Sequence, residues 1–230
     1  MKRIEGGVTA AIGFQAAGGS AGIKKENVKD MALIYSIVPC VAAGTFTTNL
    51  VKAAPVKWDQ EIVYDGDTAQ AIVCNSGVAN ACTGKKGYTY CHETAKVAAE
   101  ELHIPEGSVL VASTGVIGKQ LPIEKIQEGV RKLVPLLSNS REAAREAAQA
   151  IMTTDTKQKE AAVTMEIGGK TVTIGGMCKG SGMIHPNMCT MLSFLTTDAD
   201  ITKEMLQEAL SDVVKDTYNM ISVDGDTSTN

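Results

Sequence analysis

The spacing of apolar residues along the chain predicts a mixture of strands and helices. Short runs of β-branched and apolar residues that end at Pro, Gly or Asn are typical of strands, and apolar residues three or four positions apart are typical of helices. We expect strands over residues 30–39, 42–48, 69–74, 109–112 and 190–197, and helices over residues 89–103, 122–134, 140–152 and 202–218. This order predicts an α+β protein in which helices cover a largely antiparallel sheet.

Local signals support several of these boundaries. Pro122 suits the first turn of a helix, where its missing N–H is not needed. Ser140 is a favourable N-cap for the Ala-rich helix that follows. The residues between 162 and 177 alternate on both sides of Gly168-Gly169, which predicts a hairpin with a two-residue turn.

Composition narrows the class of protein. The 230 residues are 44% hydrophobic and 21% charged, which excludes a disordered chain or a coiled coil. A chain of this size buries roughly 70% of its unfolded surface. The net charge is -4, with 22 basic against 26 acidic residues and no basic stripe, so we expect no nucleic-acid partner.

The cysteines and the N-terminus indicate a cytoplasmic protein. No two cysteines form the C-x-x-C spacing of zinc or redox sites, so we expect reduced, packed thiols and no metal. Glu5 follows Met1-Lys2-Arg3 at once, and no apolar run approaches the about 20 residues of a membrane span. We therefore expect a soluble cytoplasmic protein without a membrane partner.

The segment richest in chemistry is KGSGMIHPNMCTML, from Lys179 to Leu192. Its glycines and proline predict a tight loop that delivers Thr190 to the start of an apolar strand. A Thr hydroxyl held in such a turn can attack the Cys189 carbonyl, and hydrolysis of the resulting ester makes Thr190 a new N-terminus. Its α-amine, with a pKa of about 7.7 to 8.0, then serves as base for its own hydroxyl. The alternative is a Gly-rich loop entering a strand in which Thr is simply favourable.

The last nine residues, 222–230, are polar and follow an apolar pair without a closing element. They fit either a natural terminus or a chain that stops within a domain. Asp224-Gly225-Asp226 lacks the further carboxylates of a calcium loop, so we expect no metal there.

Seven segments together resemble one known family. They are GGVTAA, AAGTFTTN, NSGVANACTG, ASTGVIG, AIMTTDT, GGMCKGSGMIHPNMCTML and SVDGDTSTN. Their order is similar to that of the ornithine acetyltransferases, the glutamate N-acetyltransferases of arginine biosynthesis. The resemblance implies a layered N-terminal-nucleophile architecture like that of self-processing aminopeptidases. It also implies that the C-terminal part is missing, because the family is longer than this chain.

The resemblance implies a cleavage and an assembly. Self-cleavage between Cys189 and Thr190 gives an α chain of residues 1–189 and a β chain that begins at Thr190, of which residues 190–230 are the start. Two α and two β chains form a heterotetramer. One departure is that the family usually has Ala where this chain has Cys189. A thiol is intrinsically the better nucleophile, so Cys189 attacking the Met188 carbonyl stays an alternative.

The resemblance also assigns roles to the site residues. Thr190 is the nucleophile, and Thr114 with Gly115 forms the oxyanion hole. Thr153, Lys179 and Thr190 contact the substrates, whose carboxylate suits the Lys179 ammonium. Without the resemblance, the segment 113–118 would be an ordinary turn after a strand, Thr153 a helix-end residue and Lys179 a surface cation.

The implied reaction is a ping-pong acetyl transfer from N-acetylornithine to glutamate through an acetyl-Thr190 ester. No cofactor is needed, because the donor already carries the acetyl group in an amide. The sequence leaves open whether acetyl-CoA is also a donor. His185 lies in the cleavage loop, but the Thr190 amine makes a separate base unnecessary. Two alternatives remain: a related aminopeptidase or amidohydrolase, and a fragment without activity.

Overall fold

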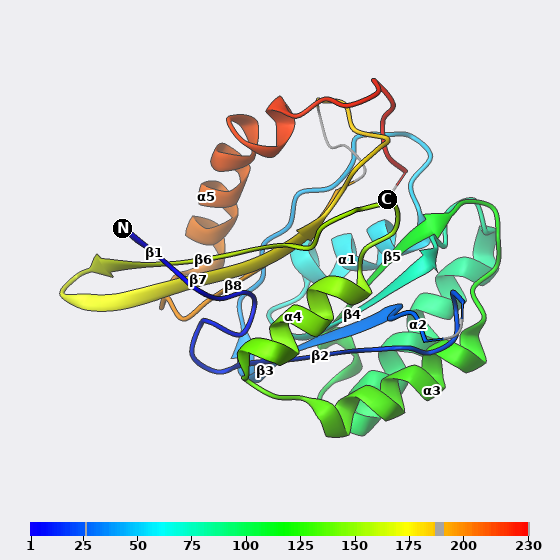
Figure 1. Ribbon diagram of the computed structural model, residues 1–230, viewed down its shortest axis with the longest axis horizontal. Coiled ribbons are helices and arrows are strands. Elements are labelled where there is room, and N and C mark those ends of the chain that lie inside the picture. Colours follow the sequence, from blue (N-terminus) through cyan, green and yellow to red (C-terminus); the bar gives the residue numbers. More distant parts are fainter. Residues whose placement is uncertain (26, 187–190, 230) are drawn as a thin grey trace.

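The computed structural model describes residues 1–25, 27–186 and 191–229, which form two sheets and the helices around them (Figure 1). Within these residues, one four-stranded sheet has the order β2-β3-β4-β5 and the other the order β1-β6-β7-β8. The first sheet comprises β2 (Phe14–Gly19), β3 (Met31–Cys40), β4 (Ala69–Val78) and β5 (Val109–Val116). The second comprises β1 (Lys2–Ile4), β6 (Lys159–Ile167), β7 (Lys170–Lys179) and β8 (Leu192–Thr197).

Helices lie on both faces of the first sheet. The described helices are α1 (Ala54–Asp65), α2 (Gly84–Leu102), α3 (Ile123–Leu133), α4 (Arg141–Ala150) and α5 (Lys203–Lys215), with short 3-10 turns at Glu106–Ser108, Val134–Leu136 and Tyr218–Met220. Helix α4 packs between the two sheets, whereas α2 and α3 cover the opposite face of the first sheet (Figure 1). None of the described helices combines the length and the apolar character that a membrane span needs.

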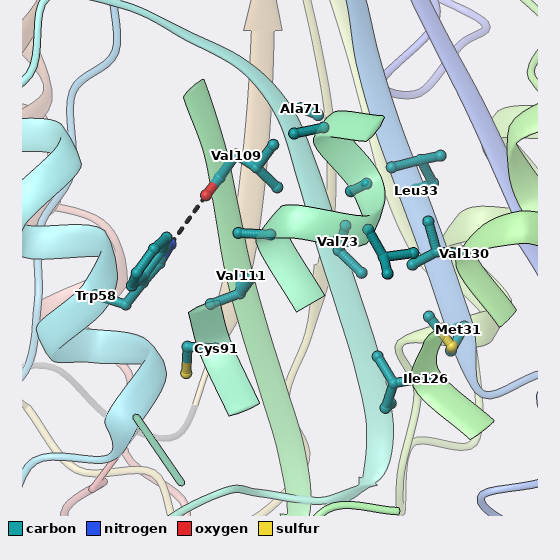
Figure 2. Close-up of a cluster of buried hydrophobic side chains, with 14 of the residues drawn as sticks. Met31, Leu33, Trp58, Ala71, Val73, Cys91, Val109, Val111, Ile126 and Val130 are labelled. Carbon is teal, nitrogen blue, oxygen red and sulfur yellow. Dashed lines mark hydrogen bonds between the residues drawn. The ribbon is translucent and has the colours of Figure 1, made fainter. Parts of the chain in front are cut away.

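The larger core lies between the first sheet and helices α1, α2 and α3. Met31 and Leu33 from β3 meet Ile126 and Val130 from α3 in this core (Figure 2). The indole Nε1 of Trp58 donates a hydrogen bond of 2.9 Å to the carbonyl oxygen of Val109 (Figure 2). The one polar atom of this large side chain is therefore satisfied inside the core.

The second core depends on small residues. The inner face of α4 is almost entirely alanine, so the helix can lie close to both sheets. A Cβ added to Gly18 of β2 would lie 2.2 Å from the backbone carbonyl carbon of Glu146 in α4, so only glycine fits there. The side chain of Ser140 accepts the N–H of Ala143 and caps this helix, as the sequence predicts.

The hairpin prediction is confirmed and one strand prediction is wrong. β6 and β7 pair from Ile167↔Lys170 outward, and Gly168 and Gly169 both have positive φ. Residues 42–48 form no strand. Their polar groups are satisfied from elsewhere: Gly44 exchanges hydrogen bonds with Gln207, and the Thr47 hydroxyl donates to the carbonyl of Ser228.

The sheets are also less uniform than expected. The second sheet is antiparallel throughout its described pairs, but β4 and β5 of the first sheet run parallel. The connection between them contains α2, as a parallel crossover requires. The carboxyl ends of β4 and β5 therefore lie side by side, and Gly77 pairs with Gly115 there.

The cysteines among the described residues are free thiols, and their burial differs. Cys74 and Cys91 are buried in the two cores, as the packing role predicts. Cys82 is exposed, so the packing role is wrong for this residue. It follows β4 with a positive φ of 56°, which places it in the loop before α2.

Candidate active site

Thr114 and Gly115 lie at the carboxyl end of β5, where the backbone turns sharply. Gly115 has a φ of +132°, which side chains disfavour. A Cβ on Gly115 would lie 2.3 Å from the carbonyl carbon of Gly77 on the neighbouring strand. The two strands can approach this closely because residue 115 is glycine.

The buried side-chain amide of Asn75 supports this turn. The hydroxyl of Ser113 donates a hydrogen bond of 2.6 Å to Oδ1 of Asn75, and Nδ2 of Asn75 donates one of 2.9 Å to the carbonyl of Val78. Both Asn75 and Ser113 are buried. The Asn75 side chain therefore ties β4 to β5 at the residue before Thr114, a supporting role that the sequence analysis missed.

Lys179 joins this turn from the other sheet. It is the last residue of β7, and its Nζ donates a hydrogen bond of 3.3 Å to the hydroxyl of Thr114. Each of the two residues is only 3% exposed. Two residues that lie 65 positions apart and were assigned separately to the oxyanion hole and to substrate contact thus form one site.

The buried ammonium of Lys179 is poised to hold an anion. Burial lowers the pKa of Lys179 from its ordinary value, and the nearby Asp155 carboxylate offsets part of that effect. Burial likewise raises the pKa of the Cys74 thiol to about 12, so Cys74 is neutral at neutral pH. A cation in a poorly solvated position gains more from a carboxylate partner than an exposed one does.

Asp155 connects Lys179 to the third assigned residue, Thr153. Its carboxylate accepts the backbone N–H of Gly180 at 2.8 Å and that of Thr153 at 3.2 Å. Nζ of Lys159 forms an ion pair of 2.6 Å with Oδ1 of Asp155. The Asp155 side chain has no exposed surface. Asp155 therefore fixes the chain at both substrate-contact residues.

The charge of Asp155 is maintained by these partners. Burial alone would raise its pKa, but the hydrogen bonds from Lys159, Gly180 and Thr153 outweigh burial and lower it. The sequence signal for this residue is a carboxylate inside the short polar segment Thr153-Thr154-Asp155, directly after a helix.

A second lysine lies near the site. Nζ of Lys24 donates to the carbonyl of Met152 at 2.5 Å, next to Thr153. Burial lowers the pKa of Lys24, and the positive charge of Lys179 adds to that effect although Asp30 opposes it. Asp30 also accepts the backbone N–H groups of Ala21, Ile23 and Lys24, which fixes the loop that carries this lysine. The sequence analysis did not identify Lys24.

The proposed nucleophile Thr190 and its neighbour Cys189 lie outside the described residues. The chain on both sides of the loop returns to the site, because Lys179 and Leu192 are opposite each other in β7 and β8. β8 begins at Leu192, so the predicted strand start at Thr190 lies two residues earlier than the strand that the structure describes. His185 is exposed in this loop. No group of three or more metal-ligating side chains occurs in the part of the chain that the structure describes.

Comparison with known proteins shows the family of this chain. Residues 15–230 match the model of the ArgJ family. The "Arginine biosynthesis bifunctional protein ArgJ" of Symbiobacterium thermophilum is 54% identical over 232 residues, covering 100% of this chain and 57% of that relative. The protein of the same name from Lactococcus lactis is 51% identical over 230 residues, again with 57% of the relative covered. The chain thus spans little more than half the length of the curated relatives it matches.

Solved structures agree with this family. A crystal structure of the arginine biosynthesis bifunctional protein argJ from Bacillus halodurans has a TM-score of 0.76 and 45% identity, covering 83% of this chain and 97% of that one. The ornithine acetyltransferase of Mycobacterium tuberculosis, solved in complex with ornithine, has a TM-score of 0.74 and 41% identity, covering 82% and 97%. An aminopeptidase from Ochrobactrum anthropi with a variant Ntn hydrolase fold has a TM-score of 0.51 at 12% identity, covering 94% and 70%, and shows the fold alone.

Proposed function

The chain belongs to the ArgJ family, and on that premise we propose that the protein transfers an acetyl group from N-acetylornithine to glutamate. The acetyl group is carried as an ester on Thr190, after self-cleavage between Cys189 and Thr190. The observation that carries the proposal is the buried contact between Lys179 and Thr114, which places a cation and a hydroxyl at one point between the two sheets.

Each candidate site residue that the structure describes has a role in this proposed reaction. The hydroxyl of Thr114 and the backbone at Gly115 stabilise the oxyanion that forms when the acetyl carbonyl is attacked. Lys179 holds the carboxylate that both amino-acid substrates carry. Thr153, fixed by Asp155, contacts the substrate beside it.

The proposed reaction moves the acetyl group first to Thr190 and then to glutamate. The Thr190 hydroxyl attacks the acetyl carbonyl while its own α-amine takes the hydroxyl proton. The carbon–nitrogen bond breaks, and ornithine leaves with a proton returned by that amine. The amine of glutamate then attacks the acetyl ester and restores the Thr190 hydroxyl.

The lengths of the solved relatives support self-cleavage. In the structural matches, 82% to 83% of this chain covers 97% of each solved chain. In the sequence matches, this whole chain covers only 57% of each curated relative. The solved chains are therefore about half as long as the curated ones. Residues 1–189 make up the same share of this chain's 230 residues as the part that the solved relatives cover. A precursor cut before Thr190 into α and β chains explains both observations, and we propose that two of each chain assemble.

The reaction needs no cofactor, because an acetyl group moves from one amine to another. Product analysis tests the proposal: the protein at the full length of its relatives is incubated with N-acetylornithine, with and without glutamate. We expect N-acetylglutamate and ornithine in equal amounts, and little acetate. Release of acetate independent of glutamate would instead indicate an amidohydrolase. A third incubation, with acetyl-CoA and glutamate, decides whether acetyl-CoA is a donor.

A further inference from the structure

A segment near the end of the chain is bound to the loop that carries the proposed cleavage position. The carboxylate of Asp224 accepts the backbone N–H of Met183 at 2.7 Å through Oδ2 and that of Ile184 at 2.9 Å through Oδ1. The backbone N–H of Val223 donates to the carbonyl of Ile184 at 2.9 Å. We call residues 218–229 the strap.

The contact imposes a particular conformation on the loop. Met183 has a φ of +56°, which is unusual for a residue with a side chain. Ile184 is buried at 2% exposure, whereas Asp224 lies on the surface. The hydrogen bonds from Met183 and Ile184 lower the pKa of Asp224, so its carboxylate stays charged at neutral pH. Each of the two N–H groups has its own acceptor oxygen here, an arrangement that a carboxylate supplies and a side-chain amide, with one oxygen, does not.

The strap also contacts the chain on the far side of the cleavage position. The hydroxyl of Tyr218 lies 2.8 Å from that of Ser193 in β8. At its other end, the strap is anchored to the segment before α1, where the Thr47 hydroxyl donates to the carbonyl of Ser228 and the N–H of Ala53 donates to the carbonyl of Thr229. The strap thus reaches both flanks of the cleavage loop from an anchored position.

We propose that Asp224 is a positioning residue for self-cleavage, holding Met183 and Ile184 so that the chain that follows them is presented for cleavage between residues 189 and 190. This inference rests on the proposed function, because it presupposes cleavage there. The loop between the paired residues Lys179 and Leu192 spans residues 180–191, and the Asp224 contact fixes it at Met183 and Ile184. A shorter free loop samples fewer conformations, so the reactive one is populated more often.

The same contact has a second consequence after cleavage. Met183 and Ile184 then belong to the α chain, while Asp224 belongs to the β chain. The hydrogen bonds that prepared the loop therefore hold the last part of the α chain against the β chain. This keeps Lys179 beside the site after the connection is cut.

The experiment uses the protein at the full length of its relatives, produced by in vitro translation and sampled over time. Cleavage is followed by the appearance of the α and β chains. We expect Asp224→Asn to slow cleavage at least tenfold, because one N–H loses its acceptor. Asp226→Asn removes the same charge two residues later and should cleave at the wild-type rate. Asp224→Glu retains two acceptor oxygens and should restore most of the rate, which separates loss of the acceptors from a general sensitivity to substitution at this position, while Asp226→Asn controls for the charge.

Further measurements distinguish failure of the proposed function from failure of the role proposed for Asp224. If the wild-type protein is not cleaved at all, the proposed function fails and this inference fails with it. If the wild type is cleaved and Asp224→Asn is cleaved equally fast, the role of Asp224 alone is refuted. Amide hydrogen exchange in the uncut Thr190→Ala background provides a readout that does not depend on cleavage. The Met183 and Ile184 amides should exchange faster when Asp224→Asn is added, and unchanged exchange would also overturn the inference.

Discussion

Nζ of Lys179 lies 3.3 Å from the hydroxyl of Thr114, and these two residues lie near the carboxyl ends of strands in different sheets. The contact exists because β7 of one sheet and β5 of the other converge at their carboxyl ends. It brings together a hydrogen-bond donor for an oxyanion and a cation for a carboxylate. In the proposed reaction, these neighbouring groups hold the reacting carbonyl and the carboxylate of one substrate.

Replacement of Thr114 tests the oxyanion role. Thr114→Ala should lower kcat by roughly 10²-fold with little change in KM, because one such donor stabilises mainly the transition state. Thr114→Ser keeps the hydroxyl and should retain most of the activity. Steady-state kinetics of acetyl transfer provides the measurement. An unchanged kcat in the Ala variant would leave this segment as an ordinary turn after a strand.

Replacement of Lys179 tests the carboxylate contact and its pH dependence. The pKa of Lys179 is lowered by burial, so the ammonium is lost at a lower pH than in an exposed lysine. Binding of glutamate should therefore weaken as pH rises through that lowered pKa. Lys179→Met should bind weakly at every pH, without this transition. Calorimetric titration of glutamate checks both expectations, and equal affinity of the variant and the wild type at neutral pH would refute the contact.

Asp155 should make the stability of the protein sensitive to acid. Its pKa in the folded protein lies below the ordinary value of 3.8, which it has in the unfolded chain. Its contribution is therefore complete above that value and is lost as pH falls through the folded pKa. Urea unfolding should show Asp155→Asn to be less stable than the wild type at pH 7, with the difference shrinking near pH 3. A difference that is constant across this range would contradict the ion-pair interpretation.

Gly115 and Gly118 offer a matched pair for the close approach of β4 and β5. Both have positive φ, but a Cβ on Gly115 would collide with the backbone of Gly77, whereas one on Gly118 meets nothing within 4 Å. Gly118→Ala should cost about 1 kcal/mol of unfolding free energy from backbone strain alone. Gly115→Ala should cost clearly more and lower activity, as measured by thermal unfolding and kinetics. Equal destabilisation would mean that the strands separate easily.

The sequence predicts those parts of the fold that local chemistry determines. The Gly168-Gly169 turn and the Ser140 cap are satisfied by neighbouring residues, and both are confirmed. The strand predicted at residues 42–48 fails because its partners, Gln207 and Ser228, are far along the chain. The helix α1 was missed although Pro55 occupies its first turn.

The same limit applies to the candidate site. The turn at Thr114 and the residue Lys179 can be found from the resemblance, but their contact depends on how two sheets meet. Asp155 and Asp224 act through backbone N–H groups of other segments. Since any residue can supply an N–H, the sequence carries little sign of these partners.

The most direct test of the central claim is an intact-mass measurement of the purified protein at the full length of its relatives, combined with sequencing of any new N-terminus. The account predicts two chains, one ending at Cys189 and the other beginning with Thr190, and a single uncut chain for Thr190→Ala. A new N-terminus at Cys189, cleavage that persists in Thr190→Ala, or an active wild-type protein that remains uncut would contradict it.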